Sequence, residues 1–269
     1  GRYTGNNPAI AAKLANWLKA LADRAAVPSA LVGSPDFVET SIAVAVLDAL
    51  DYARIAGNLV VVIGEPGVGK TTALAHYKES TNNVWLMTAS SDTAALVPML
   101  DELSLSVGVE PTSHGGAAGL RRAIERKIRD TRGVLVVDEG QHLDFKAMES
   151  LRSIHDRTRI GLVIAGHPDL EENLRRSPQA NSRVSRRVVL RQPTRSDVVE
   201  VAAVVAGEHL PIGDLEVDYL LTFAQLPGGL RWVVNILKMA LYLGMGMQSV
   251  PKMALLKNAT EALNIGDRA

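Results

Sequence analysis

The residues best suited to bind phosphate lie in one short segment, Gly64-Glu65-Pro66-Gly67-Val68-Gly69-Lys70-Thr71. Its glycines let the backbone curl so that several N–H groups point inward at an anion, and a helix starting here would add the positive end of its dipole. We expect Lys70 to reach the β- and γ-phosphates of a nucleotide and the Thr71 hydroxyl to bind Mg²⁺. The segment predicts a phosphate-binding loop formed by Glu65, Pro66, Gly67, Val68, Gly69, Lys70, Thr71 and Thr72.

The stretches on either side of this loop provide the context that such a loop needs. The apolar run 59–63 reads as a buried strand, and the Ala-rich stretch 72–79 reads as a helix. The alternative is a glycine turn that merely joins a strand to a helix. The complete strand–loop–helix pattern favours phosphate binding.

A second apolar run, 134–137, ends in two acids, Asp138 and Glu139. An open parallel sheet places its ligand at the carboxyl ends of its strands, where these carboxylates would lie. We expect Asp138 to help bind Mg²⁺ and Glu139 to orient or activate an attacking water, since hydrolysis needs a base within reach of that water. The alternative is a pair of solvated acids that open a loop, and the upstream phosphate-binding loop argues against it.

A third apolar run, 160–166, is followed by His167. A polar group at the end of this strand would lie between the two motifs and could contact the γ-phosphate or the water. A helix cap before Pro168 is an equally good interpretation of this histidine.

Arginines gather between residues 173 and 196, where the sequence has no acid. Such a run is usually a solvated face, but phosphoryl transfer is often completed by an arginine supplied from a neighbour. The best candidates for that role are Arg183 and Arg186, followed by Arg187. Arg231 begins a predicted helix, where its charge opposes the helix dipole. This position indicates an anionic partner such as nucleotide phosphate, or else a solvent-facing side chain.

The elements that must position these residues alternate between strands and helices up to about residue 192. Strands are predicted at 59–63, 84–88, 133–139, 160–166 and 188–190. Helices are predicted at 8–25, 40–56, 72–79, 93–107, 117–131 and 144–158, with a short one starting at Pro168. Solidly apolar strands separated by helices indicate an α/β fold with a parallel sheet covered on both faces. After Pro193 no strand is evident and helices fit at 195–208, 214–226, 229–243 and 251–264, which indicates a small helical domain.

Composition narrows the possible classes of protein. The 269 residues are 47% hydrophobic, and Lys+Arg and Asp+Glu both number 29, so net charge gives no sign of a nucleic-acid partner. The absence of cysteine excludes disulfides, thiolate metal sites and cysteine nucleophiles, and it fits a cytoplasmic protein. No uninterrupted apolar stretch reaches the ~18 residues of a membrane span, and no secretory signal is evident. The chain begins at Gly1 and not at Met, so we expect N-terminal material to precede it.

Together these motifs resemble those of AAA+ ATPases. Segment 64–71 matches Walker A, segment 134–139 matches Walker B, His167 takes the sensor 1 position, the Arg183/Arg186 region matches the arginine finger, and Arg231 matches the sensor 2 arginine. A closer similarity is to the MuB/TnsC/TniB group of DNA-transposition ATPases. It is carried by the start 1–6 with the following Trp17 helix, by the segments 37–40 and 166–168, and by the arginine tract.

The resemblance implies a P-loop AAA+ core, with a five-stranded parallel sheet flanked by helices, and an all-helical lid. It divides the chain into an N-terminal helix and linker (1–34) that follows a missing DNA-binding domain, a nucleotide-binding domain (35–192) and a lid (193–269). It also implies ATP and Mg²⁺ as cofactors, with Phe37 and Thr40 near the adenine.

The implied activity is ATP-dependent self-assembly into a helical filament on double-stranded DNA. Such an assembly would contact the DNA backbone without sequence specificity, deliver the target to a transposase, stimulate strand transfer and disassemble on hydrolysis. The implied location is the bacterial or host-cell cytoplasm, in association with the nucleoid.

The residues that contact DNA are not fixed by a motif. Our candidates are the basic face of the helix 121–129 and the loop 90–93, with Arg121, Arg122, Arg126, Lys127, Ser91 and Thr93 as the contacts. A solvated helix surface is an equally good interpretation of the basic face. Two other functions stay open: an IstB/DnaC-like helicase loader, and a nucleotide-switched scaffold with negligible hydrolysis. The intact Glu139 argues against the scaffold.

Overall fold

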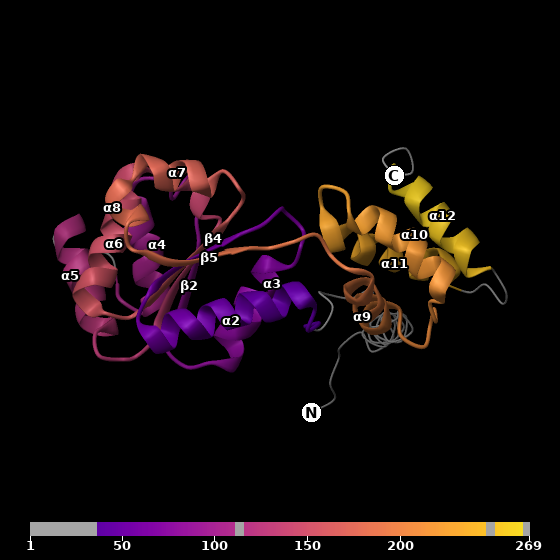
Figure 1. The fold of residues 1–269 in the computed structure, drawn as a ribbon, viewed down its shortest axis with the longest axis horizontal. Coiled ribbons are helices and arrows are strands. Elements are labelled where there is room, and N and C mark those ends of the chain that lie inside the picture. The colour runs from indigo at the N-terminus through magenta and orange to yellow at the C-terminus, as the bar shows by residue number, and fades with distance from the viewer. Residues whose placement is uncertain (1–36, 111–115, 246–250, 266–269) are drawn as a thin grey trace, which may run out of the picture.

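The computed structural model describes residues 37–110, 116–245 and 251–265. The predicted helix at 8–25 and the N-terminal segment 1–34 lie outside these residues. A sheet with its covering helices forms one end of the described structure, and a group of helices forms the other end (Figure 1). No helix within these ranges is long and apolar enough to cross a membrane.

The sheet of the described chain has five parallel strands in the order β2-β3-β4-β1-β5, which confirms the predicted fold class. The strands are β1 (Leu59–Ile63), β2 (Val84–Thr88), β3 (Val134–Asp138), β4 (Gly161–Gly166) and β5 (Val184–Val189). Every residue of the three central strands is buried, because helices cover both faces of the sheet.

Alternating side chains of the strands pack into two separate cores. Val60 and Val62 face α2 (Ser41–Ala56) and α3 (Lys70–Ser80). Val61 and Ile63 face the other side, where a larger group of helices completes the core. That group comprises α4 (Leu96–Val107), α5 (Ala117–Ile128), α6 (Phe145–Thr158), α7 (Leu170–Arg176) and α8 (Pro178–Asn181).

The helices after the sheet have an apolar core of their own, built around Phe223, Ile236, Leu237 and Leu256. The described residues place them at α9 (Arg195–Ala206), α10 (Asp214–Ala224), α11 (Gly229–Gly244) and α12 (Lys252–Ala262). These four helices confirm the predicted helical region, although three of them end before the residue that the sequence indicated.

Asp197 connects the two parts of the chain. It lies in the first turn of α9, is 1% exposed, and accepts hydrogen bonds from the backbone and hydroxyl of Thr194, which caps α9. It also accepts from the backbone N–H (2.6 Å) and the hydroxyl (2.9 Å) of Ser41 at the start of α2. One buried carboxylate thus satisfies unpaired donors at the N-termini of two helices.

Several predicted boundaries are wrong. β5 begins at Val184 and not at Val188, because it is an edge strand with polar residues at 185–187 and has no continuous apolar run. α5 ends at Ile128 and not at residue 131, since Arg129 leaves the helical conformation (ψ 141°) and Asp130 has a positive φ of 61°. α7 begins at Leu170, two residues beyond Pro168. α4 begins at Leu96, whereas the prediction was residue 93.

Candidate nucleotide-binding site

Three of the predicted motifs meet at the carboxyl edge of the sheet. β4 lies between β1 and β3, with Ile63 beside Gly166 and Val137 beside Ile164. The loop after β1, the acids that end β3 and His167 after β4 therefore lie next to one another. The strand order places His167 between the phosphate-binding loop and the two acids, as the sequence predicted.

The phosphate-binding loop has the backbone that its glycines allow. Gly67 and Gly69 have φ values of 82° and 108°, in the region that favours glycine, and Lys70 is the first residue of α3. The Val68 side chain is buried in the core beneath the loop, so this residue can contribute only its backbone.

The Lys70 ammonium group is fixed by two hydrogen bonds to backbone carbonyls of the loop. Its Nζ donates to the carbonyl oxygens of Gly64 (2.6 Å) and Glu65 (2.9 Å), and the side chain is 5% exposed. Burial lowers the pKa of Lys70, against the opposing field of Glu139 and Asp138. Two of its three N–H donors are used, and no carboxylate of the described residues forms an ion pair with it. The remaining donor fits a phosphate oxygen.

Thr71 and Asp138 form a pair of oxygen donors beside this lysine. The Thr71 hydroxyl donates to Asp138 Oδ2 at 2.6 Å, and the backbone N–H of Glu139 donates to Oδ1 at 2.9 Å. Asp138 is 1% exposed, and burial raises its pKa despite these two hydrogen bonds. A hydroxyl and a carboxylate are ligands that Mg²⁺ prefers, so the pair fits this ion together with phosphate oxygens.

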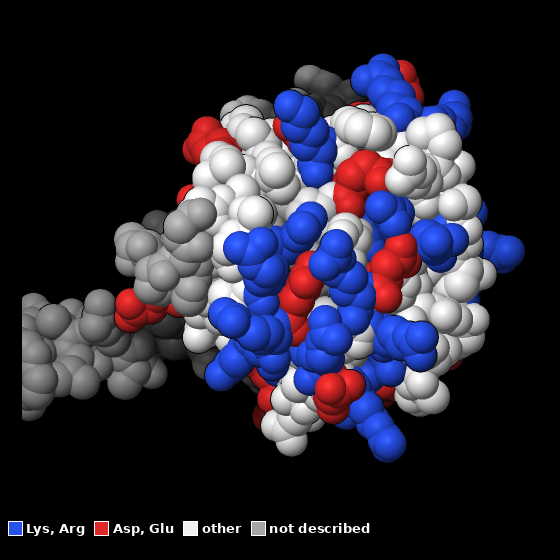
Figure 2. Space-filling view, turned by 90° about the vertical axis from the view of Figure 1, so that its left-hand side faces the viewer, with Lys and Arg blue, Asp and Glu red and all other residues white. Residues whose placement is uncertain are grey.

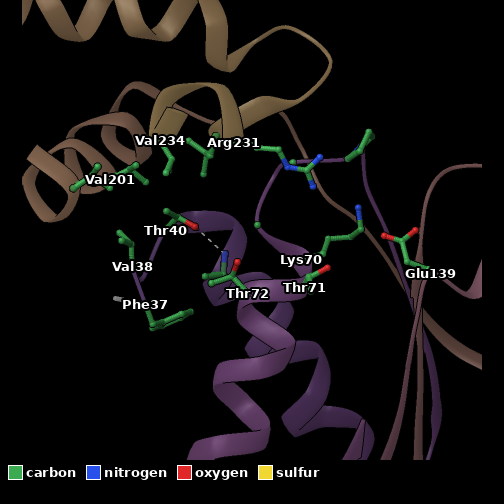
Figure 3. Close-up of a pocket in the computed structure, with 16 residues that line it drawn as sticks. Phe37, Val38, Thr40, Lys70, Thr71, Thr72, Glu139, Val201, Arg231 and Val234 are labelled. Carbon is green, nitrogen blue, oxygen red and sulfur yellow. Dashed lines mark hydrogen bonds between the residues drawn. The ribbon is translucent and has the colours of Figure 1, made fainter. Parts of the chain in front are cut away.

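Glu139 faces Lys70 across a cavity (Figure 3). It has a positive φ of 55° and leads into a short 3-10 turn, Gly140–His142. The His167 side chain is turned toward other groups: its Nδ1 lies 3.0 Å from Asp169 Oδ2, and its Nε2 lies 3.7 Å from Glu65 Oε2.

The cavity is about 270 Å³ in volume and lies between the sheet and the group of α9 to α12. Its polar end contains Lys70, Thr71, Glu139 and Arg231. Its other end is apolar, which suits a flat heterocyclic base. The apolar lining is formed by Phe37, Val38, Ala43, Val201, Val205, Leu230 and Val234.

Phe37 and Thr40 both line this apolar end, and each already has a partner. The Phe37 ring stacks on His76, with centroids 3.7 Å apart and an interplanar angle of 5°. The Thr40 hydroxyl accepts from the backbone N–H of Ala43 at 3.1 Å and so caps α2. Both residues position the start of α2 beside the cavity.

The start of α11 packs directly on the phosphate-binding loop. The Arg231 backbone N–H donates to the Gly67 carbonyl at 3.2 Å. A Cβ on Gly67 would lie 1.9 Å from the carbonyl oxygen of Gly228, so only glycine fits at this contact. This close approach brings the Arg231 side chain to the polar end of the cavity (Figure 3).

The chain is similar to several known proteins. A family described as "AAA domain" matches residues 54–174. ATP-dependent target DNA activator B of Escherichia phage Mu is 30% identical over 245 residues, which cover 89% of this chain and 76% of the relative. Mu-like prophage FluMu DNA transposition protein B of Haemophilus influenzae is 33% identical over 236 residues, covering 85% and 80% respectively.

The chain belongs to the MuB family. This membership confirms the resemblance that the sequence motifs indicated. Two solved structures share the fold of this MuB relative. ORC2 of Aeropyrum pernix, in its ADPNP–ADP complexes, has a TM-score of 0.64 at 15% identity, with coverage of 88% of this chain and 71% of that chain. The RuvB Holliday junction branch migration motor of Thermotoga maritima has a TM-score of 0.58 at 16% identity, with coverage of 88% and 75%.

The candidate finger arginines of this MuB-family chain lie away from the cavity. Val184 pairs with Leu59, so β5 begins at the sheet edge opposite the phosphate-binding loop. Arg183 Nε lies 3.2 Å from Asp156 Oδ1. Arg186 Nη2 donates to Asp48 Oδ2 at 2.6 Å, and its guanidinium lies 5.5 Å from the centre of the Tyr52 ring. Arg187 pairs with Glu171 and Asn181.

The candidate DNA contacts on α5 differ in their exposure. Arg122, Arg126 and Lys127 are exposed, whereas Arg121 is half-buried and lies 3.5 Å from the buried carboxylate of Glu125. The end of the molecule that carries α5, α6 and α8 has many more Lys and Arg side chains than acids (Figure 2). The basic face predicted on α5 is therefore part of a larger basic surface.

Both candidate hydroxyls in the loop after β2 already have hydrogen-bond partners, and the Ser91 hydroxyl donates to Asp92 Oδ1 at 3.5 Å. Ser91 is exposed, but the Thr93 hydroxyl accepts from the backbone N–H of Ser90 at 2.8 Å and closes a turn. A DNA contact by Thr93 would have to share that hydroxyl.

Sequence reasoning missed three residues around the site. Asp197 could have been found, because Thr194-x-x-Asp197 before an apolar helix is the pattern of a capping box. Gln141 and His76 had no such signal, because their partners become apparent only when the strands and helices are placed.

Proposed function

We propose that this chain is an ATPase whose binding to double-stranded DNA depends on ATP and has no sequence specificity. It assembles into helical filaments on that DNA. The filament selects and delivers target DNA and activates a transposase, and hydrolysis drives its disassembly. The observation that carries the proposal is the convergence of Lys70, Thr71, Asp138 and Glu139 at a cavity that Arg231 completes. The relatives named as target DNA activators support the transposition role.

The roles of the residues follow from their surroundings. Lys70 has a spare N–H for a phosphate oxygen, and Arg231 adds a second positive charge at the same end of the cavity. Thr71 and Asp138 would hold Mg²⁺, which neutralises phosphate charge when bound. Glu139 is the candidate catalytic residue because its carboxylate lines the cavity and could orient the attacking water.

Assembly would complete the site. An arginine at the sheet edge opposite the cavity cannot serve its own nucleotide, but it could reach that of an adjacent subunit packed head to tail. Arg183 is the better candidate, because its side chain is 53% exposed and, among the residues that the structure describes, pairs only with Asp156 at 3.2 Å. Arg186 would have to leave both Asp48 and the Tyr52 ring.

The DNA contact is proposed for the exposed cations of α5. Arg122, Arg126 and Lys127 are exposed on one helix, and that helix lies at the end of the molecule where Figure 2 shows many Lys and Arg side chains. Contact with a phosphate backbone requires such a basic surface. Since α5 does not line the nucleotide cavity, its variants separate DNA binding from nucleotide binding.

The test is binding to a random-sequence duplex, measured by fluorescence anisotropy with ATP, with ADP and without nucleotide, across a salt series. We expect cooperative, salt-sensitive binding only with ATP, and filaments in electron micrographs of the same samples. A double variant, Arg126→Glu/Lys127→Glu, should weaken binding, while the control Lys78→Glu on the exposed end of α3 should not. Intact ATPase activity without DNA binding in any nucleotide state would refute the DNA role.

A further inference from the structure

Gln141 forms a hydrogen-bond network that joins Glu139 to the neighbouring strand and to α7. Its Nε2 donates to Glu139 Oε2 at 2.5 Å, and its Oε1 accepts from the backbone N–H of His167 at 3.0 Å. Its main-chain carbonyl accepts from Asn173 Nδ2 at 2.5 Å. One residue thus contacts the candidate catalytic acid, the end of β4 and α7.

The partners of the Gln141 amide determine its orientation. A backbone N–H can only donate, so the amide atom that faces His167 is the oxygen. An ionised carboxylate can only accept, so the atom that faces Glu139 is the nitrogen. Both bonds require the same orientation, and a flipped amide would lose them together.

Two glycines make room for this arrangement. A Cβ on Gly166 would lie 2.4 Å from Oε1 of Gln141, so the amide fits here only because Gly166 has no side chain. A Cβ on Gly140 would lie 2.4 Å from Cγ2 of Ile164, so the turn packs closely against β4. The position of Gln141 is therefore fixed by packing as well as by hydrogen bonds.

Glu139 depends on this amide for its orientation. Among the residues that the structure describes, Gln141 is the only side chain that hydrogen-bonds to the Glu139 carboxylate. The Glu139 backbone is in the left-handed region, which directs the side chain to the cavity that Lys70 also lines. Without the amide, this flexible carboxylate would have several positions available.

We propose that Gln141 is a positioning residue of the ATPase site, which holds the Glu139 carboxylate toward the cavity and links its position to β4 and α7. This inference rests on the proposed role of Glu139 in hydrolysis. Misplacing a reacting group by about 1 Å can lower a rate about 100-fold. Gln141 does not line the cavity, so its loss should lower kcat and leave nucleotide affinity unchanged.

Two variants and a matched control test the inference. Gln141→Met keeps the length of the side chain and removes both amide bonds. Gln141→Glu keeps the shape and an acceptor for the His167 N–H, but it places a second carboxylate against Glu139. The control is His142→Ala, an exposed residue in the same turn. Steady-state phosphate release with duplex DNA gives kcat and KM, and a fluorescent ATP analogue and thermal unfolding report on affinity and fold.

We expect kcat to fall by about 10- to 100-fold for Gln141→Met and further for Gln141→Glu, with KM and the dissociation constant within about twofold of wild type. A packing role alone predicts that the isosteric Gln141→Glu is as active as wild type. The inference is overturned if Gln141→Glu keeps wild-type kcat while Glu139→Gln is inactive, and this outcome leaves the proposed function intact. A wild-type protein without ATPase activity overturns the proposed function and, with it, this inference.

Discussion

Replacing Asp197 with alanine should destabilise the protein strongly, because this carboxylate serves two helices in the two parts of the chain. Its loss leaves two part-buried backbone N–H groups, those of Thr194 and Ser41, without their acceptor. A fully buried donor left unpaired costs roughly 1–3 kcal/mol, and the low end applies to these part-buried groups, so we expect a loss of about 2 kcal/mol in the free energy of unfolding. For a chain of this size that corresponds to a fall of about 4–8 °C in Tm.

The pH dependence of this loss has a definite sign. Burial alone would raise the pKa of Asp197, but hydrogen bonds from the backbone N–H groups of Thr194 and Ser41 outweigh it and hold the pKa below its ordinary value. A depressed pKa means that the stabilisation is fully present above the unfolded pKa of about 3.9 and is lost as the pH falls through the folded value. The difference between wild type and Asp197→Ala should therefore be constant near neutrality and shrink below about pH 4.

The assay is urea unfolding of both proteins from pH 7 to pH 3, followed by circular dichroism. The matched control is Glu216→Ala, which removes the corresponding acid of α10, where the bond to the Gly213 N–H is exposed. The control should cost less than about 0.5 kcal/mol. Equal losses for the two variants, or a difference that does not change with pH, would refute the reasoning. ATP affinity should also fall in Asp197→Ala, since Ser41 begins the helix next to the nucleotide cavity.

Four further outcomes test the site itself. Lys70→Ala should abolish binding of a fluorescent ATP analogue, and retained affinity would contradict its role. Glu139→Gln should leave that binding intact and stop phosphate release, and normal turnover would contradict its assignment. Gly67→Ala should weaken ATP binding, because the new Cβ would lie 1.9 Å from the Gly228 carbonyl oxygen and push α11 from the loop, so unchanged affinity would argue against this contact. An equal mixture of the Arg183→Ala and Glu139→Gln proteins should recover about one quarter of wild-type turnover if subunits mix at random, because an active site then needs one subunit of each kind in the right order. No recovery would exclude Arg183 as the arginine supplied in trans.

The phosphate-binding loop and the two acids could be predicted from the sequence because each depends on a few consecutive residues. The apolar run before Gly64 and the glycines around Lys70 specify a strand, a turn and a helix start through local backbone preferences. The run before Asp138 specifies a buried strand in the same way. Five such strands alternating with helices were enough to predict the parallel sheet.

The boundaries that the sequence misplaced lie where a local pattern is weak. β5 contains three consecutive polar residues at 185–187 because it is an edge strand, and its Arg186 pairs with Asp48 on α2, far away in the chain. α5 ends where Arg129 leaves the helical conformation and Asp130 adopts a positive φ, and no glycine or proline in this part of the sequence indicates that end.

The sequence by itself determined the phosphate-binding chemistry, the fold class and the family, since these follow from residue types at fixed short spacings. Only the tertiary structure decided how the site is completed. The packing of α11 on Gly67 brings Arg231 to the cavity, and the close contact of the turn with β4 directs the Gln141 amide at Glu139. These contacts join segments distant in the chain, and their energies depend on packing and hydrogen-bond geometry that no local pattern contains.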